Sequence, residues 1–242
     1  MASKAKTYPE IRIPSPVTQT WLAYKENPVA MAALWGMACL LLVVIFGPSF
    51  VSYNPLQQDP NALLLPPSWA AHGTIVHFLG TDDLGRDLLT RLIYGARLTF
   101  GSAVVATLIA MLCGCAVGLL AGMSRGLKSS ILHHMLDTLL SIPSLLLAIV
   151  LVAVLGPGLD NAALAVTLTL TPQFIRATYN AVNDELQKEY IVAVRLDGSP
   201  PLRILRLAIL PNIVDIIVAQ TTRALSTAIL DISAVCFLGI GA

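Results

Sequence analysis

Five long apolar runs constrain the fold of this chain more than any other feature of its sequence. They extend from about residue 29 to 50, 98 to 123, 135 to 155, 161 to 182 and 208 to 237. A helix needs about 20 apolar residues to cross a bilayer, and each run supplies them. Charged residues make up only 12% of the chain, against about 25% in a soluble domain. The sequence therefore predicts an all-α membrane protein, a polytopic helical bundle with five spans.

The distribution of basic residues predicts the orientation of these spans. With the N-terminus in the cytoplasm, the inner segments hold eleven basic residues and the outer segments three, as the positive-inside rule requires. The inner set is Lys4, Lys6, Arg12, Lys25, Arg125, Lys128, Arg176, Lys188, Arg195, Arg203 and Arg206, and the outer set is Arg86, Arg91 and Arg97. Residues 1–28 form a cytoplasmic segment and residues 29–242 one transmembrane domain, with an external segment at 51–97 and a cytoplasmic loop at 183–207. The first run follows a long polar lead without a small-residue cleavage site, which favours an uncleaved helix over a signal peptide.

The cytoplasmic loop contains a pattern typical of two short helices joined by a sharp turn, which we call the elbow (Glu189–Pro211). Apolar residues recur at helical spacing up to Val194, and Gly198 stands where a left-handed helix cap is expected. Ser199 is the predicted N-cap of the second helix, and the prolines after it fit a first helical turn. Such an elbow can fit a groove of a soluble partner and transmit its motion.

The elbow resembles the EAA loop of permease subunits of bacterial ABC importers. When the sequences are aligned on Gly198, Leu210 and Pro211 fall on the final Leu-Pro of that motif and Ala193 on its second position. Val192, Val194 and Ala208 depart from it. The segments FLGTDDLGRDLLTRLIYGARLTFGSAVV (78–105) and AILDISAVCFLGIGA (228–242) are similar to the dipeptide and oligopeptide branch. LLPPSW (64–69), LDTLLSIPSLLLAIVLVAV (136–154) and DELQKEYIVAVRLDG (184–198) look closest to its Sap type.

This resemblance, which covers nearly the whole chain after Val29, implies a type I importer permease. It implies a multi-pass protein of the bacterial cytoplasmic (inner) membrane that moves peptides, antimicrobial peptides among them. The implied partners are a second permease subunit in a heterodimer, two ATP-binding subunits, an extracytoplasmic substrate-binding protein and the lipid bilayer. The motif assigns coupling to the ATPase to Ala193, Gly198, Leu210 and Pro211, and location adds Arg195 and Asp197. Nickel, a polyamine or another small solute is the alternative cargo.

The chain is expected to be non-catalytic, without a cofactor or metal, and its net charge of +1 does not suggest nucleic-acid binding. It contains no GxxxxGK[ST] loop. GMSRGLKSS (122–130) only resembles one and is better interpreted as a short inner loop. A membrane enzyme would need convergent His, Glu or Ser groups at membrane depth. His133 and His134 stand alone at a helix end, and the four cysteines are interpreted as apolar fillers.

Several residues inside the predicted spans stand out. Gly114, Gly118 and Gly122 end a stripe of small residues, which favours helix packing within this subunit over contact with a second permease. Arg223 and Asp231 are charges in the fifth run, too far apart along a helix to pair, and mark a pathway or an ion pair with another helix. For Asp231 the structural interpretation is favoured. Pro143 and Pro172 predict kinks, with a hinge as the alternative.

Two further expectations concern the external segment and the end of the chain. Thr81 or Asp82 is predicted to cap an external helix that continues through Leu84, Leu88, Leu92 and Tyr94. A solvated face is favoured there over a metal site formed by Asp82, Asp83, His72 and His77. The chain ends at Ala242 after the fifth run, where relatives continue to a further helix, so we expect a C-terminally truncated form.

Overall fold

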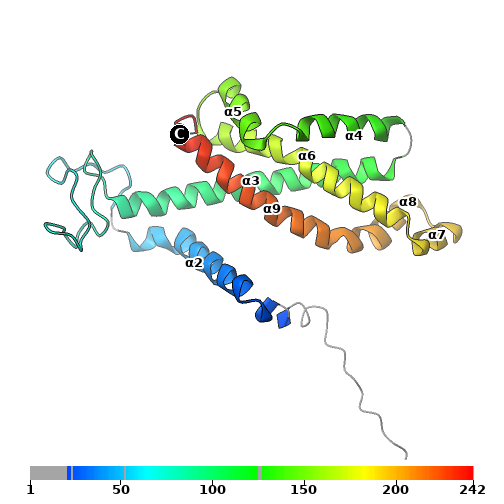
Figure 1. Cartoon of the computed structure of the whole chain (residues 1–242), viewed down its shortest axis with the longest axis horizontal. Coiled ribbons are helices and arrows are strands. Elements are labelled where there is room, and N and C mark those ends of the chain that lie inside the picture. The colour runs from blue at the N-terminus through cyan, green and yellow to red at the C-terminus, as the bar shows by residue number, and fades with distance from the viewer. Residues whose placement is uncertain (1–20, 23, 52, 125–126, 242) are drawn as a thin grey trace, which may run out of the picture. The chain divides into compact units, whose positions relative to one another are not determined.

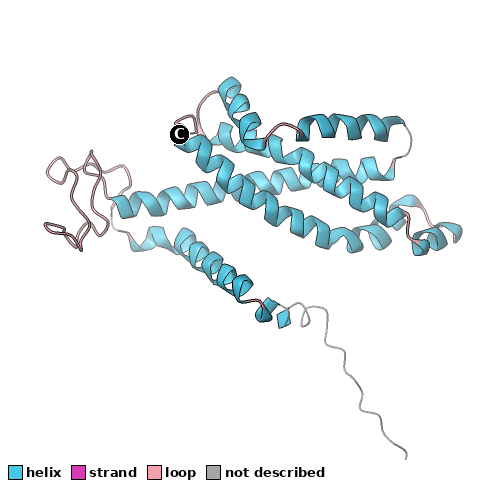
Figure 2. Cartoon of the chain, viewed as in Figure 1, coloured by secondary structure: helices cyan, strands magenta, loops and turns pink. Residues whose placement is uncertain are grey.

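The computed structural model describes residues 21–22, 24–51, 53–124 and 127–241, and the regular elements in this part are helices (Figure 2). A single bridge between Thr81 and Asp87 is the exception. The chain divides into two compact units, residues 1–94 and residues 95–242. Most of the predicted N-terminal cytoplasmic segment lies outside the described residues, as does Arg125 of the predicted inner loop.

The first unit contains helix α2 (Pro28–Phe50), which matches the first apolar run. Asn27 caps it, because its Oδ1 atom accepts hydrogen bonds from the backbone N–H groups of Val29 and Ala30 at 3.0 and 3.2 Å. Pro28 occupies the first turn, where a missing N–H costs little. Most side chains of α2 are exposed and apolar, as expected of a helix surrounded by lipid.

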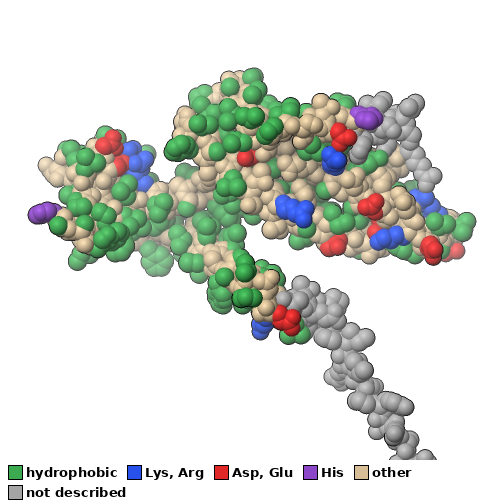
Figure 3. All heavy atoms as spheres, viewed as in Figure 1, with side chains coloured by type: hydrophobic (Ala, Val, Ile, Leu, Met, Phe, Trp, Pro, Cys, Tyr) green, Lys and Arg blue, Asp and Glu red, His purple; other side chains and the backbone are tan. Residues whose placement is uncertain are grey.

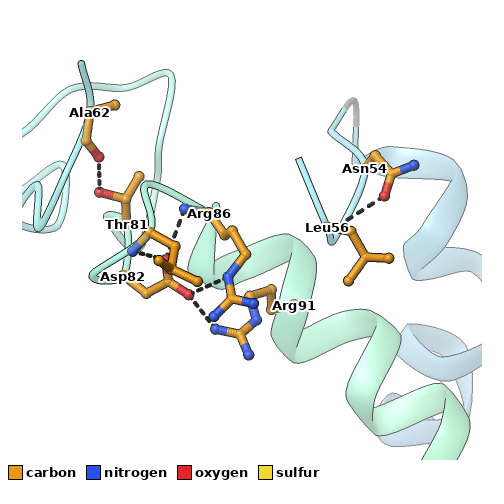
Figure 4. A network of polar contacts seen from close by, with 8 residues as sticks. Asn54, Leu56, Ala62, Thr81, Asp82, Arg86 and Arg91 are labelled. Atoms are coloured by element: carbon orange, nitrogen blue, oxygen red, sulfur yellow. Dashed lines mark hydrogen bonds and ion pairs between the residues drawn. The ribbon is translucent and has the colours of Figure 1, made fainter. Parts of the chain in front are cut away.

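The predicted external segment, residues 53–87, consists of turns held by backbone and side-chain hydrogen bonds together (Figure 4). The backbone N–H groups of Leu64 and Ser68 donate to the carbonyls of Asp82 and Phe78, both at 3.1 Å. The Thr81 hydroxyl donates to the carbonyl of Ala62 at 2.5 Å and accepts from the N–H of Leu65 at 2.9 Å. The Asp82 carboxylate accepts from the Arg86 N–H at 2.9 Å and Nε at 2.8 Å, and also from the Arg91 guanidinium. Burial acts to raise the pKa of Asp82, but these hydrogen bonds outweigh it and lower the pKa to about 2.

Helix α3 (Leu88–Met123) is a single helix of 36 residues, about 54 Å long. The prediction of a separate external helix capped by Thr81 or Asp82 is wrong. The cap is Asp87, whose carboxylate accepts from the N–H and hydroxyl of Thr90 at 2.8 and 2.7 Å. The other oxygen of Asp87 lies 3.1 Å from His77 Nδ1. Helix α3 therefore begins ten residues before the predicted second span.

The third apolar run is divided into two helices, α4 (Leu127–Leu140) and α5 (Ser144–Leu155). Their axes, taken from His134–Leu140 and Ser144–Leu155, differ by 88°. Pro143 explains the break, because it lacks an N–H for a helix bond and drives the preceding residue out of the helical region. The bend is much sharper than the predicted kink. By contrast, Pro172 lies within a continuous helix, α6 (Leu159–Leu186).

Helix α6 and helix α9 (Leu210–Phe237) run side by side in opposite directions and form the core of the second unit with α5 (Figure 1). Fully buried side chains from all three helices meet there, among them Val152, Leu170, Phe174 and Ile232. Among the described residues, α2 and α3 are long and apolar enough to cross a membrane, and the bent pair α4–α5 adds a third crossing if it is one span. Helices α6 and α9 cover the other two predicted ranges but carry more charges.

Candidate functional site

The first arm of the elbow is helix α7 (Glu189–Leu196), which follows directly on α6. Glu189 lies in its first turn and Arg195 in its last. The negative charge is thus at the positive end of the helix dipole and the positive charge at its negative end, and both stabilise the helix. Ile191 is fully buried beneath the helix. The predicted first arm is therefore present, with one apolar side chain fixing its inner face.

The turn after α7 is built around Gly198, which has a φ of +76°. The backbone N–H groups of Asp197 and Gly198 donate to the carbonyls of Ala193 and Arg195, both at 3.0 Å. A Cβ atom added at position 198 would meet nothing within 4 Å in this chain. The glycine is therefore needed for its left-handed backbone rather than for space, as in a helix-ending cap.

The second arm differs in detail from the prediction. Helix α8 (Pro201–Ile204) is preceded by Pro200 rather than Ser199, and it has no side-chain cap. A π-helical segment η1 (Leu205–Ile209) follows it, and α9 then begins at Leu210 with Pro211 in its first turn. The sequence pattern did not predict the π segment. It places Leu210 and Pro211 at the base of the elbow, separated from the Gly198 turn by α8 and η1.

An apolar cluster attaches the elbow to the helices on either side of it. Ile191 of α7, Ile204 of α8 and Ile209 of η1 are at most 3% exposed. They pack with Val182 near the end of α6 and with Ile213 near the start of α9, both fully buried. Because these contacts come from every part of the elbow, it is joined as a unit to both helices.

A polar cluster reinforces this attachment around Tyr190. The Tyr190 hydroxyl donates to Glu185 at the end of α6 and lies 3.2 Å from the carbonyl oxygen of Ala208 in the π segment. Asn212 Nδ2 donates to the Tyr190 hydroxyl at 3.0 Å and to the Ala208 carbonyl at 2.7 Å. Lys188 Nζ lies 2.6 Å from the second oxygen of Glu185. One tyrosine thus connects α6, α7, the π segment and α9.

The ionisation of this cluster follows from its contacts. Burial acts to raise the pKa of Glu185, but hydrogen bonds from Lys188 and Tyr190 outweigh it, and the pKa is lowered. The hydrogen bond to Glu185 raises the pKa of Lys188. Burial, and then the hydrogen bond to Glu185, raise the pKa of Tyr190. At neutral pH the cluster is therefore a buried carboxylate that accepts from an ammonium group and a phenol.

The outer face of the elbow is exposed and mixes apolar with charged side chains. Leu196 is 83% exposed and Leu202 is 63% exposed, one on each side of the Gly198 turn. Ala193 and Asp197 are also exposed, and Arg195 is half-buried. In Figure 3, charged side chains gather over α7 and α8, on a face that is otherwise largely apolar. Exposed leucines at the tip of a well-anchored elbow are suited to insertion into a partner.

A concavity of about 340 Å³ lies beside the elbow. Its lining combines Met123, at the end of α3, with Arg195, Ser199, Pro201 and Ile204 from both sides of the turn. Of the predicted coupling residues, only Arg195 lines it. Ala193 is exposed on α7, and Asp197 and Gly198 lie in the exposed turn after it.

The predicted glycine stripe of α3 lies against α6. A Cβ atom built on Gly114, Gly118 or Gly122 would lie 2.5, 2.7 or 2.8 Å from the Cβ of Phe174, Thr178 or Val182 respectively. Ala103, Ala106 and Ala110, which precede these glycines on the helix, are also buried. Side chains larger than hydrogen would push α3 and α6 apart at all three glycines.

The two charges of α9 have opposite environments. Asp231 is 6% exposed, and one of its oxygens has no hydrogen-bond partner among the described residues. Its carboxylate contacts the hydroxyl of Ser144, the first residue of α5, rather than a cation, so the favoured ion pair with another helix is not seen. Arg223 is exposed, and within the described part of the chain it has no acidic partner. The structure therefore keeps these two residues apart.

Sequence reasoning missed Glu185, Tyr190 and Asn212. Only the spacing of Glu185 and Lys188, three residues apart, could have indicated a local ion pair. The link from Tyr190 to Ala208 and Asn212 spans eighteen residues or more and has no periodic signature.

Comparison with known proteins shows which families and relatives this chain resembles. The family described as binding-protein-dependent transport system inner membrane component matches residues 114–242. The N-terminal TM domain of oligopeptide transport permease C matches residues 15–67. The chain is 50% identical over 235 residues to the peptide transport system permease protein SapC of Escherichia coli, covering 97% of this chain and 79% of that protein. It is 52% identical to SapC of Salmonella typhimurium with the same coverage. It is 40% identical over 228 residues to the dipeptide transport system permease protein DppC of Escherichia coli, covering 94% of this chain and 76% of that protein.

Proposed function

Because the chain belongs to the family of inner membrane components of binding-protein-dependent transport systems, we propose that it is a permease subunit of an ATP-driven peptide importer of the Sap type. It is a multi-pass inner membrane protein whose curated relatives are peptide and dipeptide transport permeases. Its cargo is peptides, with antimicrobial peptides as one class. It works with a substrate-binding protein and with separate ATP-binding subunits, and a second, similar permease completes the pathway.

The elbow carries this proposal, because it has the construction that coupling to an ATPase requires. Its tip exposes Leu196 and Leu202, which can enter an apolar groove of the ATP-binding subunit. Its underside is fixed by buried isoleucines and by the Tyr190 cluster. When the groove moves, the elbow follows as a unit and carries the ends of α6 and α9 with it. The sites of contact are Ala193, Arg195, Asp197 and Gly198, with Leu210 and Pro211 at the hinge into α9.

The proposed topology has five spans and a cytoplasmic N-terminus. Helices α2, α3, α6 and α9 each cross the bilayer once, and the pair α4–α5 crosses as one broken span. This arrangement brings the elbow to the cytoplasmic side and residues 53–87 to the outside. The excess of basic residues on the inner segments supports it.

Cysteine cross-linking tests both the coupling and the topology. The four native cysteines are first replaced. Leu196→Cys is then expected to cross-link to the ATP-binding subunit and to react with thiol reagents only from the cytoplasmic side. The matched control is Leu56→Cys, since Leu56 is 76% exposed in the external segment. It should react from outside and give no such cross-link. Labelling of both positions from the same side would exclude the topology. If no ATP-binding subunit copurifies with the unaltered chain, the importer assignment fails.

A further inference from the structure

The exposed face of α9 carries a polar stripe in the middle of an apolar helix. Asn212, Asp215, Thr222, Arg223, Ser226 and Ser233 are all exposed. At 100° per residue they fall within about 100° of one another around the helix, and they extend over about 32 Å of its length. The opposite face holds the buried residues Ile213, Ala224, Ala228 and Ile232. The six residues therefore share one helix face, on which Ala219 and Leu230 are also exposed.

The hydroxyl groups of this face do not show whether it is surrounded by lipid, water or protein. The Thr222 and Ser233 hydroxyls donate to the carbonyls of Val218 and Ile229 within the helix, at 3.0 and 2.6 Å. Such hydroxyls are satisfied and can face lipid. Asp215 lies near the start of α9 and acts electrostatically on Lys188, and the Asn212 amide already donates to Tyr190 and Ala208. Arg223 has no such explanation, because a charge at membrane depth normally faces water or protein.

Arg223 is the residue that says most about the environment of this helix face. It lies 13 residues from Leu210 and 14 from Phe237, the two ends of α9, which is about 20 Å from either end. Its side chain is too deep to reach the membrane surface readily. Asp215 and Asp231 are each eight residues away, about 12 Å along the helix, and Asp231 is buried on another face. The guanidinium is thus unpaired in the described structure and directed away from the core of its own unit.

We propose that Arg223 lines the translocation pathway and binds the C-terminal carboxylate of the transported peptide. This inference rests on the proposed function and names the group that selects the cargo. A guanidinium matches a carboxylate with two parallel hydrogen bonds. The terminal carboxylate is the one anionic group that all unmodified peptides share, whatever their sequence. A path for a solute also accounts for the exposed hydroxyl residues Thr222, Ser226 and Ser233 on the same face, which an ion pair with a second permease does not require.

Uptake of two peptides by the assembled complex tests the assignment. Proteoliposomes containing the full transporter and its binding protein are supplied with trialanine or with its C-terminal amide. For Arg223→Gln, uptake of trialanine is expected to fall about 10- to 100-fold, which corresponds to loss of a charge-assisted contact. Uptake of the amide should be unchanged. Arg223→Lys should retain part of the preference for the acid. Arg97→Gln, which removes an exposed charge outside the stripe, should leave both rates unaltered.

The outcomes separate this inference from the function on which it rests. If Arg223→Gln lowers the uptake of both peptides equally, Arg223 does not recognise a carboxylate. If Arg223→Gln no longer copurifies with the second permease, while Arg223→Lys assembles and transports both peptides equally, the residue forms an interface ion pair and the inference is wrong. If the unaltered complex takes up neither peptide, the proposed function itself fails, and the inference with it.

Discussion

Substitutions of Gly198 test two roles of this residue: the left-handed backbone conformation of the turn and the proposed contact with the ATP-binding subunit. Its φ of +76° is unfavourable for any residue with a Cβ, by about 1–2 kcal/mol for alanine, less for asparagine and more for a β-branched residue. No atom of this chain lies within 4 Å of the added Cβ. The local cost should therefore increase from Gly198→Asn through Gly198→Ala to Gly198→Val, with no clash at the added Cβ itself.

Gly239 provides a matched control, because it has a φ of +77° and also has open space around its Cβ position. The same three substitutions there impose the same backbone strain just after the C-terminal end of α9, away from the elbow. Hydrogen exchange should therefore show similar local destabilisation in both series, about tenfold faster exchange for each 1.4 kcal/mol. The ratio of peptide uptake to ATP hydrolysis should fall only in the Gly198 series, with valine the most severe.

The assay measures uptake and ATP hydrolysis in the same proteoliposomes, after quantifying how much ATP-binding subunit each variant retains. Gly198→Asn should keep most of the coupling, because asparagine tolerates the left-handed region. Full coupling in Gly198→Val would refute a role for the turn in ATPase contact. An equal loss of coupling in Gly239→Val would show that backbone strain alone explains the effect.

Three further outcomes follow from other contacts. Tyr190→Phe removes a donor to the buried carboxylate of Glu185, so it should lower the local stability of α7, measured by hydrogen exchange, by about 1.5–3 kcal/mol, and by much less in a Glu185→Gln background. Gly118→Leu should destabilise the packing of α3 on α6 by about 1–3 kcal/mol or more in thermal unfolding, whereas Gly101→Leu, with nothing within 4 Å, should not. The folded-state pKa of Asp82 is lowered to about 2, so its stabilisation of the external segment is complete above about pH 4 and is lost as the pH falls towards 2. Asp82→Asn should remove that acid dependence, measured by limited proteolysis of the segment.

Local features of the chain could be predicted from its sequence because their causes are local. The turn at Gly198 needs only a left-handed residue after an amphipathic helix, and the sequence places a glycine there. Helix α2 likewise follows from a long apolar run with Asn27 and Pro28 before it.

The features that the sequence did not predict depend on residues far apart in the chain. Helix α3 begins at Leu88 because Asp87 caps it, and Asp87 also pairs with His77 ten residues earlier. The π segment leaves the Ala208 carbonyl available to Tyr190 and Asn212, from the two helices beside it. No periodic pattern in the sequence predicts either arrangement. The sharp bend before Ser144 was underestimated for a different reason: a proline marks a possible break, and the surrounding packing decides how far the helix turns.

The elbow continues directly into α9, so a movement of the elbow can be passed to that helix. The exposed leucines at the tip and the polar stripe around Arg223 belong to one stretch of chain, joined by α8 and the π segment. The buried isoleucines and the Tyr190 cluster join both arms of the elbow to the start of α9. Under the proposed coupling, a displacement applied at Leu196 would pass through the elbow to the start of α9. Because a π segment adds a residue to a helical turn and recurs at functional sites, we expect the stretch Leu205–Ile209 to determine how far such a displacement rotates α9, and with it the direction in which Arg223 points.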